Sequence, residues 1–181
     1  MQTIPISALQ NPEDVSELCH KTAEPVRVEV DGRNDLVVMS LEVYRRLEPH
    51  AEARHLFEKL MNSPQYDFDQ LKPSMLPEDE AGVYVIFLKD TGETLYVGRT
   101  KKLRRRLYTN HLMGPEANAR LKKYLVADER YPNIENMKEA KVFIRKHCAF
   151  RYLVEPDTDK RGRLEGLFAF LTNVRYIDEE H

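Results

Sequence analysis

Two β-rich runs that lie close together constrain this chain more than any other feature of its sequence. They are GVYVIFLKD, which begins at Gly82, and ETLYVGR, which begins at Glu93. Both are rich in β-branched and aromatic residues, which favour strands, and the DTG sequence between them is typical of a tight turn. The pattern therefore predicts an antiparallel hairpin over 82–99, against which the rest of the C-terminal half must pack.

The segments after this hairpin alternate between helical and strand patterns. The apolar spacing predicts helices over 101–112, 117–127 and 161–173, and a strand over 149–155. The stretch 135–148 is also predicted to be helical, although its VFI triplet suits a strand equally well. Residues 80–181 are therefore expected to form an α/β (α+β) domain, in which helices flank a small antiparallel or mixed sheet.

The N-terminal half has a pattern of its own. A helix is predicted over 11–23, a hairpin over 26–39 with its turn at Asp31-Gly32, and a helix from Leu41 to Leu60 that Pro49 can break in two. Prolines 64, 73 and 77 interrupt any longer helix. The chain is therefore divided into a small α+β domain with its following helix (1–61), a linker (62–79) and the C-terminal domain (80–181).

Composition and charge exclude some classes of protein. The chain is 41% hydrophobic and 32% charged, and no apolar run approaches the roughly 20 residues that cross a bilayer. Its start lacks the basic and apolar regions of a secretory signal, so we expect a cytoplasmic protein with two free thiols rather than a disulfide. The first 76 residues carry eight Lys/Arg against thirteen Asp/Glu, and the remainder twenty against seventeen. This asymmetry indicates two units with different partners.

Four elements in the C-terminal half occur together in a recognisable order. Gly82-Val83-Tyr84 is followed after eleven residues by Tyr96-Val97-Gly98, then by Arg106 ten positions after Tyr96, and by Glu165 in the last helix. This order resembles the GIY-YIG nuclease family over about residues 80–178. Any one tripeptide is a weak signal, whereas four elements on the expected strand, strand, helix and helix are a specific one.

The resemblance implies a metal-dependent endonuclease that hydrolyses phosphodiester bonds in nucleic acid, with double-stranded DNA as the expected partner. Tyr84, Tyr96, Arg106 and Glu165 are the implied catalytic residues, with Mg²⁺ (or Mn²⁺) on Glu165. The chemistry fits, because Mg²⁺ is bound through one or two carboxylates plus substrate phosphates, and a guanidinium matches a phosphate. One phenol is expected to orient or deprotonate the attacking water, with its pKa lowered from about 10 by nearby cations.

Two positions depart from the family pattern. Many members have His or Tyr four residues after the arginine, where this chain has Asn110, and His111 follows one residue late. One residue turns an α-helical side chain by about 100°, so His111 can join the catalytic residues only if the helix is distorted. Tyr108 is the alternative.

The family's supporting asparagine aligns with Ile177, and Asn173 is its possible substitute. The helix after the hairpin also carries many basic residues. The expected nucleic-acid-binding residues are Arg99, Lys101, Lys102 and Arg105.

Residues 1–48 resemble the Phd/YefM antitoxin family. The resemblance rests on the opening strand with Ser7, the helix around Leu18, the EPV sequence leading into the hairpin, and the SLEVY sequence that starts the next helix. It implies a homodimer formed through residues 1–48 that can contact DNA. The net negative charge of this half counts against DNA binding, so a module that only dimerises stays open.

Two functional accounts follow from the fusion of these halves. In the first, a dimer places two nuclease sites for paired cuts in duplex DNA. In the second, the first half restrains or localises a nuclease domain that cleaves weakly or not at all. An amphipathic segment with Leu56, Phe57, Leu60 and Met61 is expected to pack against the nuclease domain in either account.

Overall fold

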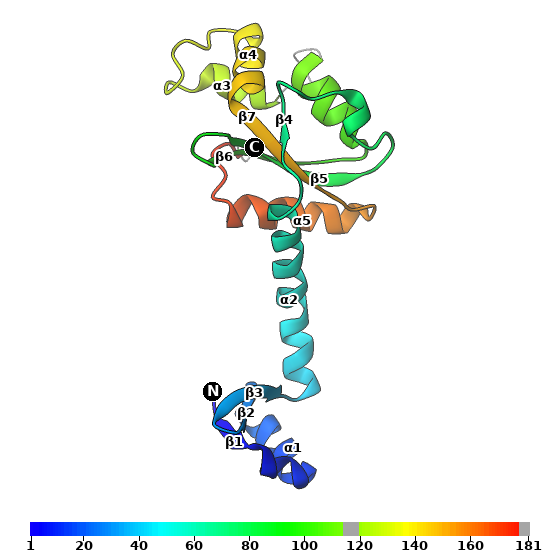
Figure 1. Ribbon diagram of the computed structural model, residues 1–181, viewed down its shortest axis with the longest axis vertical. Coiled ribbons are helices and arrows are strands. Elements are labelled where there is room, and N and C mark those ends of the chain that lie inside the picture. The colour runs from blue at the N-terminus through cyan, green and yellow to red at the C-terminus, as the bar shows by residue number, and fades with distance from the viewer. Residues whose placement is uncertain (114–119, 178–181) are drawn as a thin grey trace. The chain divides into compact units, whose positions relative to one another are not determined.

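The computed structural model describes residues 1–113 and 120–177, and the chain divides into two compact units, Met1–His55 and Leu56–His181 (Figure 1). Small sheets flanked by helices confirm the predicted α+β class. Cys19 and Cys148 are both buried free thiols. Within the described ranges, every helix is too short or too polar to cross a bilayer.

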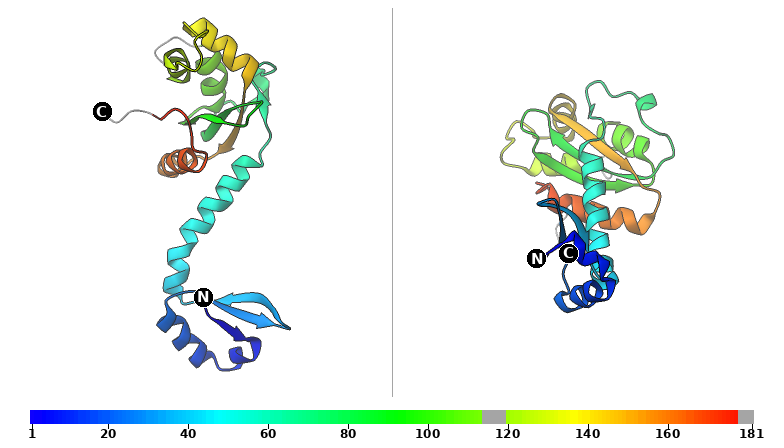
Figure 2. Two further views of the ribbon diagram at one scale, coloured as in Figure 1. Left: turned by 90° about the vertical axis from the view of Figure 1, so that its left-hand side faces the viewer. Right: turned by 60° about the horizontal axis from the view of Figure 1, so that its bottom comes forward.

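The first unit contains one three-stranded sheet with the order β1-β2-β3 (Figure 2). Its strands are β1 (Thr3–Pro5), parallel to β2 (Val26–Val30), and β3 (Arg33–Val38), antiparallel to β2. The short helix η1 (Ile6–Gln10) and helix α1 (Pro12–Thr22) connect the first two strands. The predicted hairpin turn is present, since Asp31 and Gly32 have φ values of 48° and 77°.

Helix α2 runs without a break from Leu41 to Met61, although Pro49 was expected as a possible break. Proline removes one intrahelical hydrogen bond and leaves the carbonyl four residues earlier, that of Arg45, without its usual donor. Residues 44–52 are all exposed, so water can satisfy this carbonyl and the helix continues.

The second unit is built on a four-stranded antiparallel sheet with the order β4-β7-β5-β6. Its strands are β4 (Tyr66–Asp67), β5 (Gly82–Leu88), β6 (Thr94–Thr100) and β7 (Cys148–Val154). The β5–β6 pairing confirms the hairpin that was predicted from the two β-rich runs.

Helices cover both faces of this sheet. Helix α5 (Thr158–Leu171) lies along one face together with the end of α2, and the shorter helices of this unit lie on the opposite side (Figure 1). The other elements are η2 (Pro73–Met75), the π-helix η3 (Arg105–Met113), α3 (Arg120–Ala127) and α4 (Met137–His147). The VFI triplet is therefore helical, because it lies within α4.

The side chains of β5 alternate between two hydrophobic cores. Val83 and Val85 pack against α5 and the end of α2, whereas Tyr84 and Ile86 point into the core on the side of η3, α3 and α4. This is the period-2 alternation of a strand buried on both faces. Leu56, Phe57 and Leu60 join the α5-side core as expected, while Met61 is partly exposed.

The stretch 62–79, expected to be a linker, is instead part of the second unit. Strand β4 pairs with β7, and Phe68, Leu71 and Leu76 are buried in the main core. Its prolines do exclude a long helix, but the apolar side chains between them bury enough surface to fold the segment onto the domain.

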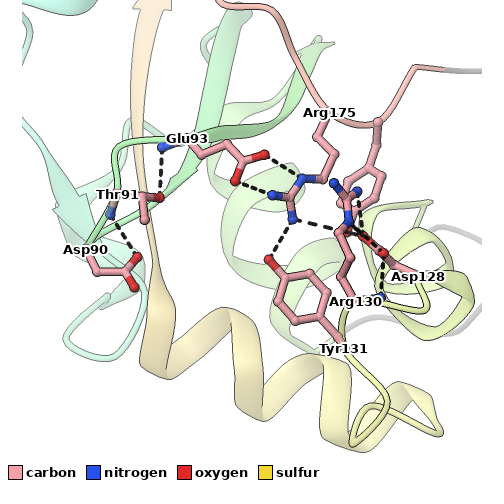
Figure 3. Close-up of polar contacts among 8 residues, drawn as sticks. Asp90, Thr91, Glu93, Asp128, Arg130, Tyr131 and Arg175 are labelled. Carbon is pink, nitrogen blue, oxygen red and sulfur yellow. Dashed lines mark hydrogen bonds and ion pairs between the residues drawn. The ribbon is translucent and has the colours of Figure 1, made fainter.

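The segment after α5 links the β5–β6 turn to the α3–α4 connection (Figure 3). Arg175 donates to the Glu93 carboxylate in the β5–β6 turn and to the Tyr131 hydroxyl, and the Tyr176 hydroxyl donates to Asp128 at 2.7 Å. The Arg130 guanidinium bonds the same carboxylate and holds the pKa of Asp128 well below its usual range. The network fixes the α3–α4 connection next to β6.

Candidate active site

Tyr84 and Tyr96 lie on adjacent strands and point to the same side of the sheet. Tyr84 is opposite Gly98, and Tyr96 is opposite Ile86, so the two tyrosines are diagonal neighbours. Their ring centroids are 6.2 Å apart. Both rings are almost completely buried in the core that η3 covers.

Gly98 makes this approach possible. A Cβ atom at this position would lie 2.5 Å from the Tyr84 hydroxyl and 2.8 Å from the edge of the Tyr96 ring. Any larger residue would therefore push one of the two phenols away. The glycine of the YVG sequence is needed for the space it leaves rather than for an unusual backbone angle.

The Arg106 side chain links the two phenols. Its Nε donates to the Tyr84 hydroxyl at 2.9 Å, and Nη2 reaches the Tyr96 hydroxyl at 3.5 Å. Arg106 is only half-buried, so the guanidinium is the most accessible polar group among these three residues. The site thus combines a partly exposed cation with two buried phenols.

His111 joins this cluster because η3 is a π-helix. In an α-helix, residues five apart differ by about 140° in direction, whereas the wider π-helix has hydrogen bonds between residues five apart and brings such residues closer to one side. Arg106 and His111 are five apart, so both lie on the inner side of η3. The five-residue separation of Arg106 and His111 is accommodated within this helix.

His111 is fully buried and contacts both phenols. Its Nε2 is 3.0 Å from the Tyr84 hydroxyl, and its ring meets the Tyr84 and Tyr96 rings edge-on. Burial, together with the positive charges of Arg106 and Lys122, holds the pKa of His111 well below its ordinary value. The imidazole is therefore neutral at pH 7, and Nδ1 is buried with no hydrogen-bond partner in the described ranges.

The pKa of Tyr84 is raised, whereas one of the two phenols was expected to have a lowered pKa. Burial raises the pKa of Tyr84, the neighbouring Tyr96 adds to the rise, and the nearby Arg106 only partly opposes it. Tyr84 is consequently protonated at neutral pH. In a fully buried position the loss of water around the phenolate outweighs one cation.

Glu165 reaches the same region from α5. Its Oε1 accepts a hydrogen bond from the backbone N–H of Arg99 at 3.1 Å, and its Oε2 lies 3.0 Å from the Nε of the same arginine. Arg99 directly follows Gly98, and the charge of Glu165 contributes to the raised pKa of Tyr84. The carboxylate thus adjoins the phenols and stays partly exposed.

The predicted nucleic-acid-binding residues have different surroundings. The Arg99 side chain is engaged with Glu165, and the Nζ of Lys102 pairs with Asp79 at 2.7 Å. Lys101 and Arg105 are exposed. Lys102 and Arg105 also line a cavity of about 360 Å³ together with Tyr108.

The residues at the two positions that depart from the family pattern, and their possible substitutes, have the following surroundings. Asn110 is half-buried, and Tyr108 lines the neighbouring cavity and packs against the core that contains Tyr84. Asn173 closes α5 with a φ of 48° and donates its N–H to the Phe170 carbonyl. Ile177 is largely exposed.

Comparison with known proteins finds a family match for the C-terminal part of the chain. Residues 80–163 match the family model described as the GIY-YIG catalytic domain, which covers Tyr84, Tyr96, Arg106 and His111 and ends just before Glu165. A domain of this family indicates a nuclease, that is, a phosphodiester hydrolase. No curated protein and no solved structure matches the chain, and no support for a Phd/YefM-like domain was found for the N-terminal residues.

Proposed function

We propose that this protein is a metal-dependent endonuclease that cleaves double-stranded DNA through the cluster formed by Tyr84, Tyr96, Arg106, His111 and Glu165. One observation carries the proposal: a half-buried guanidinium is held by two buried phenols beside a carboxylate. An arginine this well positioned can bind a phosphate group without being reorganised during the reaction.

Arg106 has the role of phosphate ligand. Its Nε donates to Tyr84 and its Nη2 reaches Tyr96, which fixes the plane of the half-buried guanidinium. Paired N–H donors in this plane match two oxygens of a phosphate. They also stabilise the extra negative charge that develops on phosphorus when water attacks.

We assign different roles to the two phenols. Tyr84 is the inner one and stays protonated, so it orients Arg106 and His111. Tyr96 is the less deeply buried phenol and is the one we assign to the attacking water. His111, kept neutral, completes the hydrogen bond of Tyr84 without adding a second positive charge.

Glu165 is the proposed ligand for Mg²⁺ or Mn²⁺. No group of three or more His, Cys, Asp or Glu side chains gathers anywhere in the described ranges, so the ion would rely on one carboxylate, waters and substrate oxygens. Mg²⁺ suits this ligand set. The ion would supply charge stabilisation at the phosphate and the leaving oxygen. A carboxylate can accept the Arg99 N–H and still offer lone pairs to a metal.

We further propose that the first unit self-associates, which gives each assembly two sites. Only four apolar residues are buried among its 55 residues, all of which the structure describes. Leu41, Tyr44 and Leu47 are exposed at three-residue spacing along the start of α2, and Leu36 is exposed on the edge strand β3. A surface of this kind fits a second copy of the same unit.

Direct cleavage assays test the proposed function. Plasmid DNA incubated with Mg²⁺ should be cut by the wild-type protein and not by Glu165→Ala, whereas Glu135→Ala, which changes an exposed carboxylate elsewhere, should cut normally. Equal cutting by wild type and Glu165→Ala would remove Glu165 from the mechanism. Absence of cutting by all three with several metals and substrates would favour the restrained, regulatory nuclease instead.

A further inference from the structure

The Arg99 side chain forms an ion pair with the carboxylate of Glu165, which we propose as the metal ligand. The contact is specific in geometry: the Arg99 Nε lies 3.0 Å from Oε2 of Glu165, while the backbone N–H of Arg99 bonds Oε1. The two residues are 66 positions apart in the sequence and come from β6 and α5. A cation therefore already lies where a divalent ion is expected to bind.

Space for this guanidinium comes from a glycine on α5. A Cβ atom at Gly162 would overlap Nη1 of Arg99 and would also lie close to the Cζ of the same guanidinium. Gly162 lies inside α5, where a glycine otherwise weakens a helix. The helix thus lacks a side chain at the place where Arg99 extends toward Glu165.

Arg99 contacts Glu165 through its backbone N–H and through its side chain, and we expect metal binding to affect these two contacts differently. The backbone N–H is fixed by β6, so it can hold Oε1 whether or not an ion is present. The Arg99 side chain is half-exposed and bears a full positive charge, so it must move when a divalent cation approaches Oε2. The freed guanidinium would then lie beside the DNA phosphates, which are its natural counter-ions.

We propose that Arg99 is an internal counter-ion of Glu165 that competes with the metal and sets the metal concentration the site requires. This inference rests on the proposed role of Glu165 as the metal ligand. Arg99 is not a catalytic residue in this account. It lowers the occupancy of the site by metal until the ion is concentrated enough to displace the guanidinium, and DNA phosphates favour this displacement by pairing with the freed side chain.

Binding of Mn²⁺ to the free protein, followed by electron paramagnetic resonance without DNA, tests the proposal independently of cleavage. Arg99→Met removes the competing charge and keeps the backbone N–H, so its Mn²⁺ affinity should rise about three- to fivefold, the range expected for a partly exposed ion pair. Gly162→Ala should raise the affinity in the same direction with Arg99 still present. Arg163→Met, which removes a positive charge from an exposed position on the same helix, is the matched control and should change little.

The outcomes separate the two claims. Unchanged or weaker Mn²⁺ binding by Arg99→Met, with binding lost in Glu165→Gln, would overturn the role of Arg99 and leave Glu165 as the ligand. Binding by Glu165→Gln as tight as the wild type would overturn the metal site itself. An equal rise for Arg99→Met and Arg163→Met would also contradict the proposal, because it would show a general charge effect. Circular dichroism melts confirm that each variant is folded.

Discussion

The two units of this protein bury their apolar residues to very different extents. The second unit has a hydrophobic core on each face of its sheet, and the first buries only Cys19, Val26, Val28 and Val43. Small units with so few buried side chains are marginally stable unless something covers their exposed apolar surface. From this difference we expect the second unit to fold without the first, and we propose that the first unit associates with a second copy of itself.

The largest expected effect is a loss of cleavage, in a variant whose self-association should be unchanged. Arg106→Ala should reduce DNA cleavage by about 10³-fold, because the phosphate loses its positioned guanidinium. Sedimentation of this variant should match the wild type, since we assign the proposed self-association to the first unit. A loss of less than about tenfold would show that the cluster is not the reaction centre.

Truncation tests whether the second unit is independent. A fragment of residues 55–181 should be monomeric and fold with nearly wild-type thermal stability, because it keeps Leu56, Phe57 and Leu60 in the α5-side core. A fragment of residues 63–181 loses all three and should be less stable by at least about 3 kcal/mol. Equal melting temperatures for the two fragments would contradict the assigned boundary.

The same fragment distinguishes the two functional accounts. Nicking without paired cuts by residues 55–181 supports a dimer that places two sites. Increased cutting supports restraint by the first unit.

The π-helix η3 contains one more residue between Arg106 and His111 than an ordinary helical turn would need, so removing a residue there tests its role. Deleting Thr109 should convert η3 toward an ordinary helix and bring the histidine to four residues after Arg106, so cleavage should stay within about tenfold of the wild type. His111→Gln, with the helix unchanged, should lose about 100-fold. A deletion variant that is folded but as impaired as His111→Gln would show that this alignment is wrong.

Self-association should depend on the first unit alone. Leu41 is 70% exposed at the start of α2, so Leu41→Glu should leave the fold intact and weaken the dimer at least tenfold in analytical ultracentrifugation. Phe170→Glu is the matched control, because Phe170 is 83% exposed in the second unit. Dimers that persist in Leu41→Glu and dissociate in Phe170→Glu would reverse the comparison.

The smallest effect concerns pH. The pKa of His111 is depressed in the folded protein, so below about pH 6.5 the unfolded chain takes up a proton that the folded chain does not. The free energy of unfolding should therefore fall as pH is lowered from 6.5, by up to about 1.4 kcal/mol per pH unit, until the folded-state pKa is reached. Denaturant titrations of His111→Gln should lack this slope. A similar slope in both proteins would assign it to other groups.

The sequence was sufficient for the features that have local signals. Both hairpins were predicted from strand composition and turn residues. The order of four motifs pointed to the residues of the candidate site, and their catalytic roles stay a prediction. The position of His111 was not, because apolar periodicity does not reveal a π-helix. The 62–79 segment was misassigned because its prolines are a stronger signal than Phe68, Leu71 and Leu76, whose burial depends on the folded sheet. The pairing of Arg99 with Glu165 joins two distant segments, so no local pattern could show it.

A crystal structure with Mn²⁺ and a short DNA duplex tests the central claim most directly. The Tyr96→Phe variant would be used to slow cleavage. We expect an anomalous peak for Mn²⁺ bonded to a Glu165 carboxylate oxygen and to a phosphate oxygen, with the same phosphate contacting Arg106. Mn²⁺ bound elsewhere, or a phosphate bound away from Arg106, would contradict the proposed active site.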